Sequence, residues 1–219
     1  MKSISKKCFT SVELLIAISV FSALLIIIVY AFLYGLNTFS KAQVVSKTQE
    51  VSRSIEQNIS QSFSLTAAGS YTPIKSVTNT NTNTNNEITS QGFCLGQYRY
   101  SYVLDEQLTS TNNYGLLQDT IQGCSTSTVS VDLSAANLPT LNTPKQLLGN
   151  NMRISNFTIT PSTPLNSSAV GYQLVMEIDY GNNLKAGTNG YKYQCPSGNI
   201  SSSFCAVAKI DTIIFQRIQ

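Results

Sequence analysis

The chain has 219 residues with 14 Lys and Arg, 11 Asp and Glu, and neither His nor Trp. Without His it has no Ser-His or Cys-His nucleophile pair and no imidazole ligand for a metal. A Gly-rich phosphate loop, a CxxC pair and an HExxH motif are also missing from the sequence. We therefore expect a protein that is not an enzyme and uses no cofactor and no metal.

The basic residues are unevenly placed. Lys2, Lys6 and Lys7 precede residue 9, so the remainder of the chain has 11 basic and 11 acidic residues. A neutral chain gives no global electrostatic support for binding nucleic acid or anionic lipid. Lysines ahead of an apolar segment predict an N-terminus in the cytoplasm and export of the chain beyond that segment.

Leu14–Leu36 is an apolar segment of 23 residues without a charge. As a helix it would measure about 35 Å, enough to cross the ~30 Å hydrocarbon core of a bilayer. Glu13 stands at its start, and two interpretations of this carboxylate stay open. It caps the helix, favoured by the helix dipole, or it pairs with another charge inside an apolar bundle. A chain cut between Cys8 and Phe9 would supply that charge as the new α-amino group of a neighbouring copy.

The residues Phe9-Thr10-Ser11-Val12-Glu13-Leu14, behind a short basic leader, resemble the class III leader and first helix of type IV prepilins and type II secretion pseudopilins. The resemblance implies cleavage between Cys8 and Phe9 by a prepilin peptidase, and methylation of the Phe9 amine. It further implies a subunit that sits in the bilayer before an inner-membrane assembly platform adds it to a filament of identical or homologous pilin subunits. The chain departs from the family at Cys8, where the family has Gly, and this puts the efficiency of cleavage in question.

Two other processing routes would give a different mature protein. Cys8 follows Ser5-Lys6-Lys7 and not an apolar stretch, which argues against lipidation. Ser40-Lys41-Ala42 has the form of a signal peptidase site that would release a secreted domain. The apolar run is too long for a signal peptide, and the helical pattern continues past it.

After Leu36 the helical pattern becomes amphipathic. Apolar or small residues recur every three or four positions: Val44, Thr48, Val51, Ile55, Ile59 and Phe63. We expect one helix from Thr10 to about Ala68, stopped at Gly69, with a break at Gly35-Leu36-Asn37 as the alternative. The predicted organisation is a leader (1–8), a transmembrane and filament-core helix (9–36), an amphipathic helix (37–69) and a globular head (70–219).

The sequence of the head predicts mainly β-strands. Predicted strands are Gln97–Leu104, Thr126–Leu133, Met152–Thr160, Val170–Tyr180 and Cys205–Ile218. We predict a polar loop at Thr78–Asn86 and a helical turn at Lys145–Gly149. We expect Pro161 and Pro164 to end the third strand. In the first strand Tyr98, Tyr100, Tyr102 and Leu104 share a face, which either packs on the helix or binds sugar. The order predicts an α+β, pilin-like fold with the long N-terminal helix packed against a C-terminal antiparallel sheet.

Four cysteines lie in the head, apart from Cys8. In an exported domain an even number predicts two disulfides with three alternative pairings. Short loops favour Cys94–Cys124 and Cys195–Cys205, whereas a zinc site would need closer pairs. The Asp179–Asn183 loop does not match the spacing of a calcium loop, so we read it as a turn.

The resemblance implies a structural subunit of a type IV pilus-like filament. The run from Leu147-Leu148 to the terminal Ile-Ile-Phe-Gln-Arg resembles minor pilins or pseudopilins. The subunit would be anchored in the inner membrane, with its head exported and on a surface pilus after assembly. The alternative is a membrane-anchored binding module, an adhesin or DNA-uptake receptor, that does not polymerise. Adhesion, motility, DNA uptake and secretion are not distinguished by the sequence.

Overall fold

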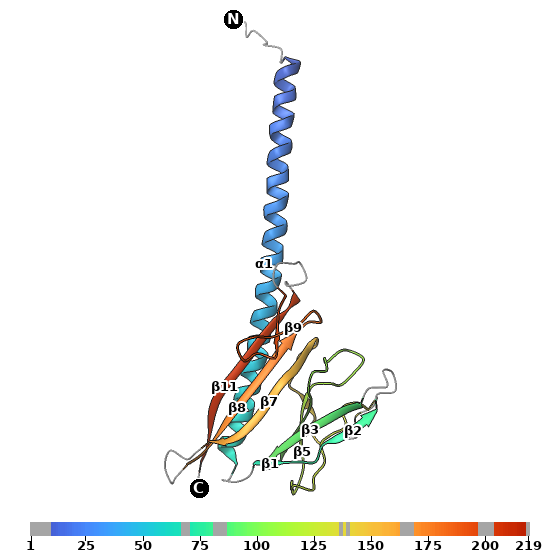
Figure 1. Cartoon of the computed structure of the whole chain (residues 1–219), viewed down its shortest axis with the longest axis vertical. Helices are drawn as coiled ribbons and strands as arrows, with labels where there is room; N and C mark the ends of the chain where they lie inside the picture. The colour runs from blue at the N-terminus through green and yellow to red at the C-terminus, as the bar shows by residue number, and fades with distance from the viewer. Residues whose placement is uncertain are drawn as a thin grey trace, which may run out of the picture. The chain divides into compact units, whose positions relative to one another are not determined.

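A computed structural model describes residues 10–66, 71–80, 87–135, 138, 141–162, 169–196 and 204–217. The helix α1 runs from Ser11 to Leu65 without a break, as predicted. The chain divides into two units, one ending at Ser40 and one formed by Lys41–Gln219. The second unit contains the end of α1 and all the strands (Figure 1).

The strands form a six-stranded sheet, a three-stranded sheet and a two-stranded ribbon, and all their pairings are antiparallel. In the six-stranded sheet the order is β1-β3-β4-β5-β6, with β2 also on β3; the three-stranded sheet has the order β11-β8-β7, and β9 pairs with β10. Their bounds are β1 Tyr71–Pro73, β2 Val77–Thr80, β3 Glu87–Leu95, β4 Tyr98–Val103, β5 Leu116–Thr120, β6 Lys145–Gln146, β7 Met152–Ser162, β8 Ala169–Tyr180, β9 Lys185–Ala186, β10 Tyr193–Gln194 and β11 Ala206–Arg217.

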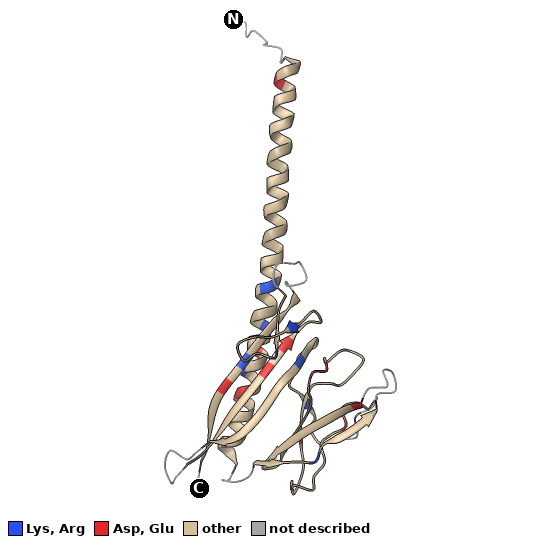
Figure 2. Cartoon of the chain, viewed as in Figure 1, with Lys and Arg blue, Asp and Glu red and all other residues tan. Residues whose placement is uncertain are grey.

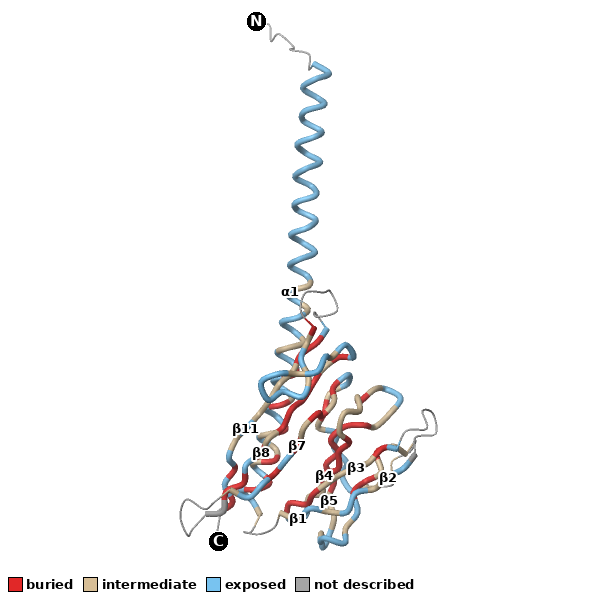
Figure 3. The backbone as a smooth tube through the Cα atoms, viewed as in Figure 1, coloured by how far each residue is buried: buried red, intermediate tan, exposed pale blue. Residues whose placement is uncertain are grey.

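The second half of α1 packs on these sheets through its amphipathic stripe. Ile55, Ile59 and Phe63 are at most 1% exposed and share a core with residues of β4 and β8. Thr48 is also buried, and Val51 is half-buried against the same core (Figure 3). The predicted stripe and the predicted α+β fold are therefore confirmed.

The tyrosine face of β4 packs inward. Tyr100 is fully buried and stacks on Phe93 with ring centroids 4.8 Å apart, which supports the packing interpretation over a sugar-binding surface. Its hydroxyl donates to Asn58 Oδ1 at 2.9 Å and accepts from Gln118 Nε2 at 3.0 Å. Ser62 Oγ lies 2.8 Å from the same hydroxyl. This network ties α1 to β4 and β5, and the apolar pattern of the sequence did not reveal it.

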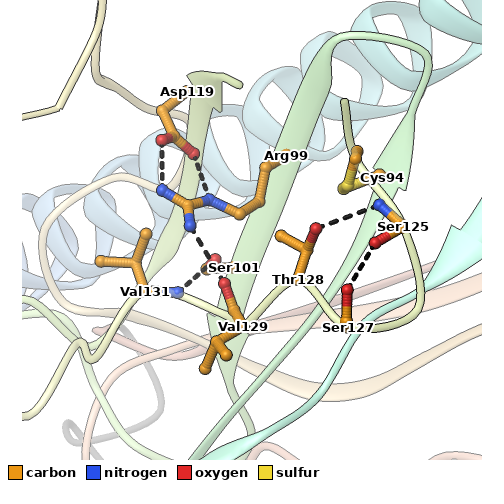
Figure 4. The surroundings of a disulfide bond; sticks show 10 residues. Cys94, Arg99, Ser101, Asp119, Ser125, Ser127, Thr128, Val129 and Val131 are labelled. Carbon is orange, nitrogen blue, oxygen red and sulfur yellow. Dashed lines mark hydrogen bonds and ion pairs between the residues drawn. A yellow bond between two sulfur atoms is a disulfide. The ribbon is translucent and has the colours of Figure 1, made fainter. Parts of the chain in front are cut away.

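The strand predicted at Thr126–Leu133 is wrong. The Val131 N–H donates to Ser101 Oγ at 2.9 Å, and the Leu133 N–H donates to Ser90 Oγ at 3.1 Å. Arg99 donates to the Val129 carbonyl at 3.0 Å, beside the Cys94–Cys124 bridge (Figure 4). Side chains of the sheet accept the hydrogen bonds of these backbone N–H groups. The segment therefore lies against the sheet without forming strand pairing, apart from a bridge between Val129 and Lys75.

Other boundaries differ from the prediction in smaller ways. Lys145–Gln146 is a short strand, not a helical turn, because Leu147 N–H donates to the Leu116 carbonyl. Pro161 lies within β7 and does not end it. The strand β3 and the division into two sheets were not predicted, and part of the Thr78–Asn86 loop is strand β2. The predicted stop at Gly69, the rest of that loop and Pro164 lie outside the described residues.

Candidate functional site: the start of the long helix

The first turn of α1 is closed by a reciprocal pair of hydrogen bonds. The Thr10 N–H donates to Glu13 Oε2 at 3.0 Å, and the Glu13 N–H donates to Thr10 Oγ1 at 3.3 Å. The Thr10 hydroxyl also donates to Glu13 Oε2, at 3.1 Å. This is a capping box, in which a Thr and a Glu three residues later satisfy backbone donors at a helix start. The capping interpretation of Glu13 is therefore confirmed.

Capping does not use the whole carboxylate. Both bonds from Thr10 reach Oε2, and among the described residues Oε1 accepts no hydrogen bond. Within the part of the chain that the structure describes, Oε1 therefore stays open to accept a further hydrogen bond. The first half of α1 has no other charged residue to compete for it (Figure 2).

Behind Glu13 the surface of the first unit is apolar on every side. Large apolar side chains from Val12 to Phe39 are 45% to 73% exposed. In the described part of the chain, α1 is the one helix that is long and apolar enough to span a membrane. Such a helix, hydrophobic all round, is normally covered by lipid or by other helices.

The structure tests the other predicted site residues in part. Cys8 and Phe9, at the expected cleavage and methylation site, lie outside the described residues. The structure joins Cys94 to Cys124 and Cys195 to Cys205, the pairing favoured from the sequence. Within the described ranges no group of His, Cys, Asp and Glu is arranged to hold a metal ion.

A buried acidic cluster in the head had no signal in the sequence. Leu174, Met176 and Ile178 of β8 face the core, so the alternating Glu177 and Asp179 point to the opposite face of the sheet. There the Lys192 and Tyr193 N–H groups donate to Glu177 Oε1 at 2.8 and 3.1 Å, so the segment 185–196, the strap, lies over it. Alternation along β8 predicts exposure of this face, but the strap, which follows β8 in the chain, folds back and covers it.

Asp179 is the unusual member of this cluster. It is fully buried, and neither of its oxygens accepts a hydrogen bond from the described residues. The pKa of Asp179 is raised to about 7, chiefly by burial. The nearby Ser155 hydroxyl and Arg153 lower this pKa, and the acidic Glu177 and Asp105 raise it. The carboxyl is therefore partly protonated near neutral pH.

Comparisons of the chain with models of known protein families, with curated proteins and with solved structures found no match. The structure itself defines the class. A long N-terminal apolar helix whose second half packs on antiparallel sheets is a pilin-like architecture.

Proposed function

We propose that this chain is a structural subunit of a type IV pilus-like filament, a minor pilin or pseudopilin, and that it is not an enzyme. It enters the inner membrane with its N-terminus in the cytoplasm. A prepilin peptidase cuts between Cys8 and Phe9 and the new amine is methylated. An assembly platform then adds the subunit, and its first helix packs among those of other pilin subunits.

The observation that carries this proposal is that Glu13 stands at the start of a helix segment whose apolar side chains are exposed on every side. An apolar surface of this extent is covered by lipid before assembly and by neighbouring helices after it. A carboxylate at the edge of such a bundle needs a compensating charge. The Phe9 amine of a neighbouring subunit supplies one, and Oε1 of Glu13 is available to it.

The capping box allows a sharp test of this pairing. Glu13→Gln keeps a side chain that can complete the box but removes the charge. We expect this variant to insert into the membrane at the normal level and to be lost from the filament, as we expect for Glu13→Ala. Thr10→Ala weakens the cap and leaves the charge, so it should still enter the filament.

Filament entry is measured by immunoblotting of sheared surface fractions against membrane fractions, with Glu50→Gln, an exposed acidic residue of the second helix half, as the matched control. Normal entry of Glu13→Gln would show that Glu13 acts as a cap alone. A chain that stays in the membrane whatever stands at position 13 would instead be the non-polymerising binding module.

A further inference from the structure

One end of the head gathers lysines and exposed aromatic residues around the start of its part of α1. Lys41 and Val45 of α1 border a groove of about 370 Å³ whose other wall includes Tyr191 and Tyr193 of the strap. Tyr191 is 43% exposed and Phe204 is 58% exposed. We call this end the collar, and define it by Lys41, Lys185, Tyr191, Lys192, Phe204 and Lys209.

The collar contains four lysines, and the acidic Glu177 lies beneath its strap. The strap contains Lys185 and Lys192 and no acidic residue, and Lys41 has no acidic neighbour in the chain before Glu50. Lys192 is paired with Asp105 at 2.5 Å. Among the described residues the other three collar lysines form no ion pair. Figure 2 shows basic residues at this end of the sheet and helix, with acidic residues of the sheet among them.

The lysines and aromatic rings are held together. Lys209 Nζ lies 5.6 Å from the centroid of the Tyr191 ring and donates to the Gly190 carbonyl at 2.9 Å. Lys192 Nζ lies 5.8 Å from the ring of Tyr193. The Cys195–Cys205 bridge ties the strap to the start of β11, and both cysteines line the groove.

Lys41, at the border of the groove, follows closely in the chain after the apolar segment. Leu36, its last residue, precedes Lys41 by five positions, which is about 8 Å of helix. The polar layer on each side of a bilayer extends roughly 5–8 Å beyond the hydrocarbon core. Lys41 therefore falls at headgroup depth when Leu14–Leu36 spans the membrane. Tyrosine and lysine are the residues that anchor proteins at this depth.

We propose that the collar docks on the surface of the bilayer, with its lysines on anionic lipid headgroups, while the subunit awaits assembly. This inference rests on the proposed function only in requiring that the first helix half spans the membrane. Docking holds the head against the bilayer, and release of the collar accompanies entry into the filament.

The chain has no Trp, so a single introduced Trp reports its own surroundings. Full-length Tyr191→Trp is placed in vesicles of phosphatidylcholine and phosphatidylglycerol, and in matched vesicles whose acyl chains are brominated near the headgroup. Bromine quenches Trp on close approach. We expect Tyr191→Trp to lose much of its emission in the brominated vesicles, and to recover emission when phosphatidylglycerol is replaced by phosphatidylcholine.

Two matched variants make the result decisive. Phe215→Trp, 50% exposed, lies nine residues along β11 from the collar end, about 30 Å away, and should keep its emission. Phe21→Trp within the apolar segment should be quenched in vesicles of either lipid charge. Quenching of Phe21→Trp with none of Tyr191→Trp would overturn the docking inference alone. No quenching of Phe21→Trp would overturn the membrane stage of the proposed function, and quenching of Tyr191→Trp that ignores lipid charge would contradict the role of the lysines.

Discussion

The two halves of α1 share one backbone conformation but relate to the rest of the chain in opposite ways. In Ser11–Ser40 apolar side chains are exposed on all sides and Glu13 is the one charge. In Lys41–Leu65 five charged residues occupy the outer face, while Ile55, Ile59 and Phe63 are buried in the head. The second half completes its environment within this chain. The first half receives no such cover from the described residues, and a helix that is apolar on every side is normally covered by lipid or by other helices.

The largest effect should come from emptying the buried stripe. Phe63 is fully buried and packs on Tyr172 with ring centroids 4.9 Å apart. Phe63→Ala should lower the free energy of unfolding of the head by about 3–5 kcal/mol, through lost burial and the cavity left behind. The measurement is denaturant unfolding of the full chain in mild detergent.

The matched change in the other half is Phe21→Ala, which removes the same side chain from a residue that is 62% exposed. It should leave unfolding of the head unchanged. Equal destabilisation by the two substitutions would contradict the division of α1 into a half that is buried in the head and a half that is exposed.

The acidic cluster predicts a pH dependence confined to the head. The ordinary pKa of an Asp is near 3.8, and burial raises that of Asp179 to about 7. Between these values the folded head holds a proton that the unfolded chain releases, so stability falls as pH rises. The loss should approach about 4 kcal/mol above pH 7. Asp179→Asn, which imitates the protonated carboxyl, should remove most of it.

This is checked by denaturant unfolding at pH 5 and pH 8, between which about 3 kcal/mol of the loss should fall. Asp211→Asn is the control, because Asp211 is exposed on β11 and should change neither value. A wild-type head that is as stable at pH 8 as at pH 5 would show that Asp179 is not held in its protonated form.

A smaller effect is expected where α1 meets β4 through polar groups. Tyr100→Phe removes the hydroxyl shared by Asn58, Ser62 and Gln118, and leaves their buried polar atoms short of a partner. We expect a loss of about 1–3 kcal/mol in unfolding free energy. Tyr98→Phe on the same strand should cost under about 0.5 kcal/mol. Equal costs would mean that the network adds nothing beyond packing.

Sequence patterns predicted the features that depend on local periodicity. The continuous helix, its buried stripe and the long strands β7, β8 and β11 agree with the spacing of apolar residues. The helix dipole favours capping by Glu13, one of the two interpretations of this carboxylate, but the reciprocal hydrogen bonds with Thr10 are found only in the structure.

The features that the sequence did not predict depend on distant contacts. Thr126–Leu133 alternates like a strand, but Ser90 and Ser101 take its backbone N–H groups. Glu177 and Asp179 occupy the alternating positions of an exposed face, and the strap from residues 185–196 buries Glu177. In both cases the contact is made by residues outside the segment, so the spacing of apolar residues within the segment does not indicate it.

The central claim is that this chain is a filament subunit, that it is cut between Cys8 and Phe9, and that it assembles through the exposed apolar half of α1. It is tested most directly by the intact mass and N-terminal sequence of the protein from its native membrane and from sheared surface material. The account predicts a chain that begins at methylated Phe9 in both fractions. A chain that begins at Gln43, or one that keeps Met1 and never reaches the sheared fraction, would contradict it.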